Sequence, residues 1–577
     1  MKKESRNKTK IRHLMMILFV ALLLRLWGIS KVPVSLFGDE LDVGYHAYSI
    51  LKTGRDYYGN FMPLHFQSIA EWRTPLYLYS CVPSVALFGI SPLGVRLPAV
   101  IFGVLGVLGI YLLTKKITDD EAVSLVSAVV LAFSPWHIQY SRAAFEVTQL
   151  LVFIIFGLYF FLRSFKEGKY LWVSVALLVL SPLVYSTAKL FVPVLMVFLF
   201  IMYKREIFSL SRRYLIYALA AGLILGSPTA YSTFFGGGGQ RFSYISVFSD
   251  ATLETQIGEM RSRDMRMNEE SDIYPKKITL ERIFHNKALF WTEKITGNYL
   301  TTFSTEFLFM KGDPNLRHSP GGMGQFYRIE ALALIVGACL FFVKFAGKRR
   351  KYLVFFLIFV GAFPSALTQG GGNHATRLIL ILPPICMLIA WGIVHGIRLS
   401  KSKTGKLILY LYSGLWILSF FFYSHNYWVH YPWDSERWWH AGFKEAIRTV
   451  RTLEKNYDKI IISMEGEPAW IFFAGWYEYP PDKWQAEFPI KSVENLEGFG
   501  NISHTGKYYF GSVSTEMGGF YALPSYIDEK TLYLATAKEV GTNLIEEPGR
   551  SPPGLELIYS SSYPSGDPAY YLFSKDK

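Results

Sequence analysis

The sequence holds only three cysteines in 577 residues, Cys81, Cys339 and Cys386, and each lies within an apolar segment. Their spacing offers neither a disulfide framework nor a set of metal ligands. The sequence also lacks a glycine-rich phosphate loop, a dinucleotide-binding motif, an internal repeat and a low-complexity tract. These absences argue against a disulfide-rich secreted domain, a soluble nucleotide-dependent enzyme and a repeat protein.

Hydrophobic residues, by contrast, make up 51% of the chain, and aromatic residues make up 17%. The formal net charge of +14 would also suit a nucleic-acid-binding protein. However, the basic residues lie in short loops between long apolar runs, which is the pattern of cytoplasmic loops in membrane proteins. The sequence therefore predicts a polytopic α-helical membrane protein, with membrane lipid and no nucleic acid among its partners.

Eleven apolar runs are long enough to be membrane spans, with boundaries good to a few residues. They lie near residues 12–29, 94–114, 121–136, 146–163, 170–186, 188–203, 214–230, 327–344, 352–368, 376–397 and 407–424. A further apolar segment, 76–90, is interrupted by Pro83, and we expect an interfacial or re-entrant helix there.

The basic residues also predict the orientation of the chain. If the N-terminus is cytoplasmic, the short outer loops 137–145, 187–189 and 369–375 contain only one arginine, Arg142, and one lysine, Lys189, whereas the inner loops are rich in both. No small-residue cleavage site follows the first run, so we expect a retained anchor. The sequence thus predicts an integral protein of a bacterial-type plasma membrane with an extracytoplasmic C-terminus.

This topology places the three large non-membrane pieces on the outer face. We expect a membrane domain at residues 1–428, with outer loops 31–93 and 231–326, and an extracytoplasmic α/β domain at 429–577. In that second domain, residues 440–455 have helical periodicity, and strands are predicted at 459–463, 507–511 and 531–535, with a terminal pair of strands at 555–573. The outer face is therefore where we expect the function.

An acidic stretch, Gly38-Asp39-Glu40-Leu41-Asp42, follows the first run directly. Acids beside a membrane are costly unless they are solvated or paired, so an adjacent pair fixed at the end of a span suggests a function. A carboxylate beside an acceptor hydroxyl can act as a general base. The alternatives are a solvated loop and, because carboxylates also suit Mg²⁺, Mn²⁺ or Ca²⁺, a divalent cation site.

Cations on the same face could bind the phosphate of a lipid-linked donor and stabilise its charge as it leaves. Each also has a structural alternative: a helix anchor, a snorkelling side chain, or a turn braced by Asp313. The candidate phosphate-binding residues are Arg142, Lys189, Arg317, His318, His374 and Arg377.

Three groups of motifs carry a resemblance to a known family. They are Gly38-Asp39-Glu40 with Lys52-Thr53-Gly54-Arg55-Asp56, Ser134-Pro135-Trp136-His137 with Ser141-Arg142, and Lys311-Gly312-Asp313-Pro314-Asn315-Leu316-Arg317-His318. Over residues 10–430 the chain resembles glycosyltransferase family 39, the protein O-mannosyltransferase and aminoarabinose-transferase relatives. Those proteins are GT-C membrane glycosyltransferases that use a polyprenyl-phosphate-linked sugar.

The resemblance implies a mannosyl- or hexosyl-type transferase that inverts the sugar and requires no cofactor. It implies that Asp39 is the general base, that Glu40 positions the acceptor or tunes Asp39, and that Arg142 binds the donor phosphate. Glu146 and Asp313 are the candidates for a second acid. The tail does not resemble the β-trefoil domain of the eukaryotic relatives, so a protein, a lipid or a polysaccharide acceptor each stays open.

Two further hypotheses come from other classes of protein. A transporter or flippase of lipid-linked sugars would use the same cations to hold phosphate, but its polar residues are expected within the membrane. Here the charges lie at the ends of spans and in outer loops, which favours the enzyme. A non-catalytic envelope scaffold that binds partners through its tail is the third possibility.

Overall fold

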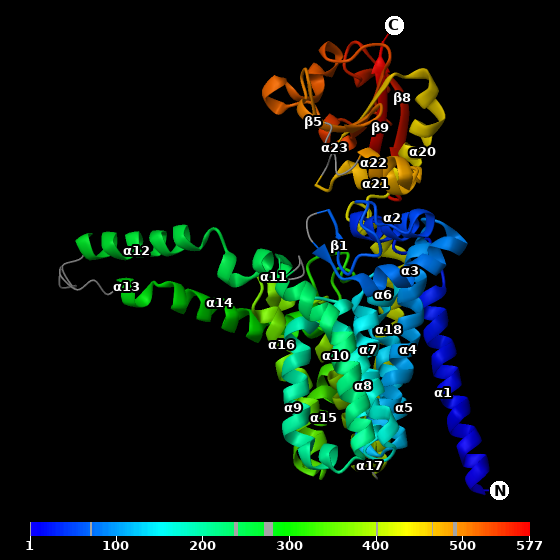
Figure 1. Cartoon of the computed structure of the whole chain (residues 1–577), viewed down its shortest axis with the longest axis vertical. Helices are drawn as coiled ribbons and strands as arrows, with labels where there is room; N and C mark the ends of the chain where they lie inside the picture. The colour runs from blue at the N-terminus through cyan, green and yellow to red at the C-terminus, as the bar shows by residue number, and fades with distance from the viewer. Residues whose placement is uncertain are drawn as a thin grey trace. The chain divides into compact units, whose positions relative to one another are not determined.

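The computed structural model describes residues 2–69, 72–235, 240–270, 281–399, 402–463, 466–487 and 493–576. Long helices dominate the first three quarters of the chain, and a sheet forms near the C-terminus (Figure 1). A helix lies at each of the eleven apolar runs. These helices are α1 (Lys2–Leu26), α4 (Pro92–Thr118), α5 (Glu121–Phe133), α7 (Val147–Ser164), α8 (Leu171–Leu180), α9 (Ala188–Phe208), α10 (Arg212–Phe235), α15 (Glu330–Lys344), α16 (Lys348–Ala366), α17 (Leu382–Leu399) and α18 (Lys403–His425).

Within the described residues, five helical segments are long and apolar enough to cross a membrane on their own. They are Pro92–Thr118, Val147–Ser164, Arg212–Thr233, Ile379–Leu399 and Lys403–Asp434. A sixth arises if α5 and α6 (Pro135–Arg142), which are bent by 57° at their junction, form one broken span. A membrane protein is thus supported, and the number of eleven spans stays a prediction.

The chain divides into two compact units by its internal contacts. We call residues 1–21, 104–138 and 147–420 the helical unit, and residues 22–103, 139–146 and 421–577 the sheet unit. The sheet unit joins the predicted outer loop 31–93 to the tail, whereas the sequence predicts a boundary near residue 428.

In the helical unit, glycines allow two helices to approach closely. A Cβ on Gly337 of α15 would lie 1.9 Å from the carbonyl oxygen of Leu388, and one on Gly392 of α17 would lie 2.1 Å from that of Ala333. Small residues at such crossings increase van der Waals contact between helices in a membrane. The predicted outer loop 231–326 contains further helices: α11 (Gln240–Ile245), α12 (Leu253–Glu270), α13 (Glu281–Phe284) and α14 (Lys287–Thr302).

The sheet unit contains a seven-stranded mixed sheet of order β4-β5-β6-β3-β7-β9-β8. Strand β3 pairs in parallel with β6 and β7, and the other pairs are antiparallel. The four strand predictions are confirmed, because they coincide with β3, β6, β7 and the pair β8–β9. The strands are β3 (Lys459–Ile462), β4 (Val493–Leu496), β5 (Gly500–Thr505), β6 (Tyr508–Phe510), β7 (Thr531–Thr536), β8 (Leu555–Ser562) and β9 (Pro568–Lys575).

Helices from both ends of the sequence share the core on one face of this sheet. From the tail come α20 (Phe443–Leu453), which confirms the helix predicted at 440–455, α21 (Ala469–Tyr477) and α22 (Pro481–Glu487). From the N-terminal region come α2 (Gly38–Thr53) and α3 (Pro75–Phe88). The apolar segment predicted at 76–90 is thus a helix of 14 residues with Pro83 inside it, which is too short to cross a bilayer.

Helix α2 packs directly on α21 and α22 (Figure 1). Gly475 leaves room for Leu41, whose side chain would lie 2.9 Å from a Cβ at that position. The Tyr45 hydroxyl donates to the Tyr479 carbonyl oxygen at 2.9 Å, and the Gln485 amide donates to Ser49 Oγ at 2.9 Å. The helix that carries the acidic stretch is therefore held by the C-terminal tail.

Candidate active site

The acidic stretch forms the first turn of α2. The helix begins after Phe37, whose backbone is extended, and Asp39 and Glu40 lie in the first turn, where the helix dipole favours negative charge. The Gly38 amide donates to Glu467 Oε2 at 2.9 Å. Because successive residues of a helix point about 100° apart, neighbouring acids enter different environments. Asp39 is exposed, with 54% of its side chain accessible, whereas Glu40 and Asp42 are buried.

Glu40 forms a buried ion pair with Arg96 of α4. Arg96 Nε donates to Glu40 Oε1 at 2.8 Å, and Nη2 donates to Oε2 at 2.7 Å, which makes a bidentate pair. The Ala144 amide also donates to Glu40 Oε1 at 2.8 Å. The remaining Arg96 N–H groups donate to the carbonyl oxygens of Ile29, Pro33 and Ser35. The pair thereby fixes the chain that leads into α2.

Asp39 and Asp42 share a second arginine, Arg73. This residue ends the short hairpin of β1 (Phe66–Gln67) and β2 (Trp72–Arg73). Its Nη2 pairs with Asp39 Oδ1, and its Nε lies 3.0 Å from Asp42 Oδ2. One guanidinium therefore bridges the buried carboxylate to the exposed one and limits the rotation of Asp39.

Asp42 is held from several sides. The Tyr57 hydroxyl donates to its Oδ1 at 2.6 Å, and Ser68 Oγ donates to its Oδ2 at 2.8 Å. Burial raises the pKa of Asp42 to about 6, while Arg73 and the two hydroxyl groups oppose that rise. Asp42 is thus ionised at neutral pH and becomes protonated in mild acid.

His46 packs beside Asp42, with 3.6 Å between His46 Nε2 and Asp42 Oδ1. Burial lowers the pKa of His46 to about 3, so its ring is neutral, and its Nε2 donates to the Gln67 carbonyl oxygen at 3.0 Å. The ring stacks on Tyr57 at 3.8 Å between centroids. The buried carboxylate of Asp42 is thus bordered by the rings of His46 and Tyr57.

Arg142, predicted to bind the donor phosphate, directs its guanidinium at backbone oxygens. Nη1 donates to the carbonyls of Leu24, Arg25 and Trp27 at 2.9, 3.1 and 2.8 Å, and Nη2 donates to that of Val32 at 2.7 Å. The last carbonyls of a helix have no partner inside it, and positive charge is favoured there. In these contacts Arg142 caps α1, and its binding of phosphate stays a prediction.

The other predicted residues are divided between the two units. Glu146 is half-buried just before α7 and belongs to the sheet unit with Asp39, Glu40 and Arg142. The helical unit holds the rest, among which Asp313, His318 and His374 come together. The remaining three are half-buried: Lys189 at the start of α9, Arg317 in the turn before His318, and Arg377, whose Nη1 donates to Thr368 Oγ1 at 2.7 Å.

Arg73 and Arg96 are not among the predicted site residues, and Asp42 has no predicted role of its own. The predicted cations are those at the ends of spans, whereas Arg73 lies within the loop 31–93. The signal available was that the acidic stretch Asp39–Asp42 has Arg73 in its own predicted loop and Arg96 just beyond that loop. The structure brings both to that stretch.

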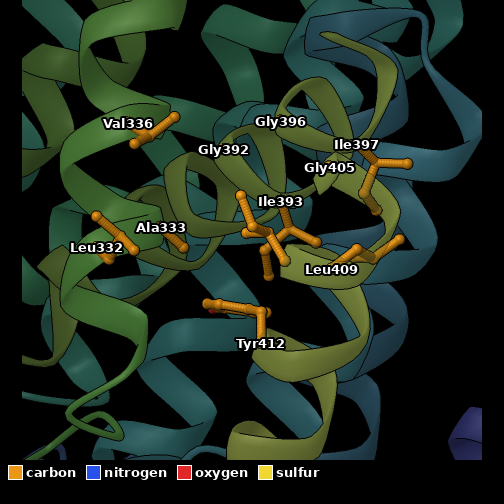
Figure 2. Close-up of a pocket in the computed structure, with 11 residues that line it drawn as sticks. Leu332, Ala333, Val336, Gly392, Ile393, Gly396, Ile397, Gly405, Leu409 and Tyr412 are labelled. Carbon is orange, nitrogen blue, oxygen red and sulfur yellow. The ribbon is translucent and has the colours of Figure 1, made fainter. Parts of the chain in front are cut away.

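A cavity of about 240 Å³ lies in the helical unit between α15, α17 and α18 (Figure 2). Leu332, Val336, Ile393 and Leu409 line it, together with Gly392 and Gly396. No lining residue is charged, and Tyr412 supplies a hydroxyl group. The apolar lining suits a hydrocarbon chain. No carboxylate, imidazole or ammonium group lines the cavity to act as an acid or a base.

The chain has the fold of the GT-C membrane glycosyltransferases, which confirms the resemblance predicted from the sequence. AglB, the oligosaccharyltransferase of Archaeoglobus fulgidus, in complex with an inhibitory peptide and a dolichol-phosphate, matches with a TM-score of 0.51 and 13% identity, over 98% of this chain and 74% of that chain. The same protein tethered to an acceptor peptide matches with a TM-score of 0.50 and 14% identity, over 98% and 74%. Its apo form matches over 81% of this chain and 63% of that chain, with a TM-score of 0.48 and 14% identity.

One segment of the sequence also matches a family model. Residues 73–231 match the family model described as dolichyl-phosphate-mannose-protein mannosyltransferase. The structure of ArnT from Cupriavidus metallidurans bound to undecaprenyl phosphate is also similar, with a TM-score of 0.48 and 10% identity, over 98% of each chain. A comparison with curated protein sequences gives no match. The matched family and these neighbours are glycosyltransferases.

Proposed function

We propose that this protein is a membrane glycosyltransferase that moves a sugar from a polyprenyl-phosphate carrier to an acceptor hydroxyl on the outer face. The observation that carries the proposal is the contrast within one helical turn. Glu40 and Asp42 are buried and bound to arginines, while Asp39 is exposed and oriented by Arg73. Of the three acids in this turn, Asp39 is the one that a bound acceptor can reach.

The reaction follows from that placement. The acceptor oxygen attacks the anomeric carbon as Asp39 takes its proton, and the bond from that carbon to the phosphate oxygen breaks. The bonding pair leaves with the phosphate. A single displacement inverts the anomeric centre and needs no covalent sugar–enzyme intermediate.

The donor phosphate then needs cations. We assign it to Lys189, Arg317 and Arg377, with His318 and His374 nearby in sequence, since positive groups in a water-poor site stabilise a leaving phosphate. For Arg142, the four carbonyl contacts favour a role in capping α1. Glu40 likewise acts as a positioning residue, and Glu146 and Asp313 remain candidates for a second acid.

The proposal includes the predicted membrane arrangement. Eleven spans place the N-terminus in the cytoplasm of a bacterial-type cell, and α2 together with the tail lies outside. A mannosyl or other hexosyl group, and a protein, lipid or polysaccharide acceptor, all fit this description.

The test is turnover by the purified full-length chain in detergent. A panel of polyprenyl-phosphate sugars is offered with envelope acceptors, and transfer is measured by mass spectrometry. We expect transfer that inverts the anomeric centre and disappears in Asp39→Asn. The rival flippase is tested in vesicles: scrambling of labelled lipid-linked sugar without acceptor, undiminished in Asp39→Asn, would overturn the proposal.

A further inference from the structure

Three side chains outside the proposed acid site form a compact cluster in the helical unit. Asp313, His318 and His374 place one ligand atom each within 4.8 Å of one another. Asp313 and His318 lie in the loop after the π-helix η5 (Glu306–Met310), and His374 follows the short helix η6 (Gly371–Asn373). Within the described parts of the chain, no other group of three histidine, cysteine or acidic side chains meets this geometry.

Backbone contacts hold the Asp313 carboxylate in place. The Asn315 amide donates to Oδ1 at 2.9 Å, and the Ala375 amide donates to Oδ2 at 2.8 Å. The second contact ties the loop of Asp313 to the loop of His374. His318 Nδ1 lies 2.9 Å from the same Oδ2, and the rings of His318 and His374 are 4.8 Å apart between centroids.

Glycines on both loops permit this close approach. Gly312 has a φ of +73°, and a Cβ there would lie 2.6 Å from the Met323 carbonyl oxygen. A Cβ on Gly371 would lie 1.9 Å from the Ser365 carbonyl oxygen. Larger residues at either position would displace the loops, so the local sequence is fitted to the cluster.

We propose that Asp313, His318 and His374 bind one zinc ion. Two imidazoles and a carboxylate are a ligand set that zinc accepts, and three protein ligands leave a fourth position for water or for the oxygen of an anion. Zinc replaces the contact between His318 and Asp313, and the Ala375 amide then orients the ligating carboxylate from outside the coordination sphere. The ion thereby ties together two loops that are separated in sequence by α15 and α16.

A second His–Asp pair in the helical unit supplies the matched control. His285 Nε2 lies 2.8 Å from Asp264 Oδ2, at a separation close to that of His318 and Asp313. No third ligand residue joins this pair in the described part of the chain. His285 therefore serves as a control histidine that contacts an aspartate but is not expected to bind a metal.

The experiment uses the full chain, purified in detergent through an affinity tag that contains no histidine. Inductively coupled plasma mass spectrometry measures the metal content of the protein purified from cells that were grown with added zinc. We expect about one zinc ion per chain in the wild type, loss of that zinc in the His318→Ala/His374→Ala double variant, and unchanged zinc in His285→Ala. After removal of the metal with a chelator, zinc titration should show that Asp313→Asn weakens binding by more than the roughly 10–100-fold typical of an outer-shell contact.

Two readouts keep the proposal falsifiable if a variant folds poorly. Cobalt added to the metal-free wild type should give the visible absorption of a four-coordinate site, and zinc should raise the apparent unfolding temperature of the wild type and of His285→Ala alike. Wild-type protein that contains no zinc and does not respond to it would overturn the proposal. So would full zinc content in the double variant, and iron or manganese in place of zinc would overturn the choice of ion.

Discussion

Two acidic sites of this protein contain similar side chains and differ in their partners. At the start of α2 the carboxylates of Asp39, Glu40 and Asp42 are bound by arginines. In the helical unit the carboxylate of Asp313 meets two histidines instead. An arginine neutralises a carboxylate and cannot ligate a metal, whereas a neutral imidazole leaves the negative charge in place and offers a nitrogen. The second site therefore has ligands for a metal, which the arginines of the first site cannot supply.

A similar contrast exists within the first site. Asp39 and Glu40 are adjacent, and each is paired with an arginine, but only Glu40 is enclosed. The difference in burial gives the two acids different roles. The buried bidentate pair of Glu40 stabilises the structure, whereas the exposed carboxylate of Asp39 can exchange a proton with a ligand. Substitutions at the two positions should separate catalysis from stability.

The largest expected effect is on turnover, in Asp39→Asn. Loss of a general base lowers the rate by about 10²–10⁴-fold, and the near-isosteric amide should leave the unfolding temperature close to that of the wild type. Steady-state transfer from the donor identified by the panel measures the effect. Asp482→Asn is the control, because Asp482 is also an exposed acid in the first turn of a helix, α22. Equal rates for both variants would remove Asp39 from the reaction.

The next effect is on stability, in Arg96→Met. Removal of one partner leaves Glu40 as a buried unpaired charge, which costs about 3–5 kcal/mol. The carbonyls of Ile29 and Pro33 also lose their donor. Denaturant unfolding of the purified protein checks this, with Arg55→Met as the exposed control, for which we expect a change within about 0.5 kcal/mol. A wild-type midpoint for Arg96→Met would contradict the enclosed pair.

A smaller effect is expected for Arg73→Lys, which keeps the charge and loses the fork that spans Asp39 and Asp42. Misorientation of the base should lower turnover by about 10–100-fold, with the KM for the donor little changed. Arg55→Lys again provides the comparison. A change in KM alone would indicate that Arg73 binds substrate and does not orient Asp39.

The smallest expected effect is a pH dependence of stability and turnover that results from the protonation of Asp42. Its pKa is raised from 3.8 in the unfolded chain to about 6 in the folded protein. This contribution to stability is therefore fully present below about pH 4 and is lost as the pH rises through 6. Turnover should instead rise as the pH increases through 6, because ionised Asp42 holds Arg73 more firmly than protonated Asp42 does. Activity that falls as the pH drops through 6 in the wild type, and a flatter profile in Asp42→Asn, would support this link.

Much of the fold could be predicted from local patterns. Long apolar runs locate the helices, and short apolar runs locate the buried strands β3 and β7, because these signals depend on neighbours in sequence. The acidic stretch also stands out by its composition. The sequence could not show which of Asp39 and Glu40 faces solvent, since that depends on where Arg96 and Ala144 pack.

The residues that contact the candidate acids were harder to predict than the acids themselves. The contact of Arg73 with Asp39 depends on a hairpin of two-residue strands, and its pattern is too short to recognise. Asp313, His318 and His374 each appear in the sequence as part of a turn, yet their meeting depends on two loops separated by two helices. Arg142 looked free at the end of a predicted span, because the need of helix α1 for a C-terminal cap is not visible in the residues around it.

The packing of α2 on the tail also sets an order of events during synthesis. Tyr45 and Tyr479, which are hydrogen-bonded, are 434 positions apart in sequence. At ordinary rates of translation, α2 is made roughly 20–90 s before its partner helix exists. The helix that carries Asp39 therefore acquires this packing partner only late in synthesis.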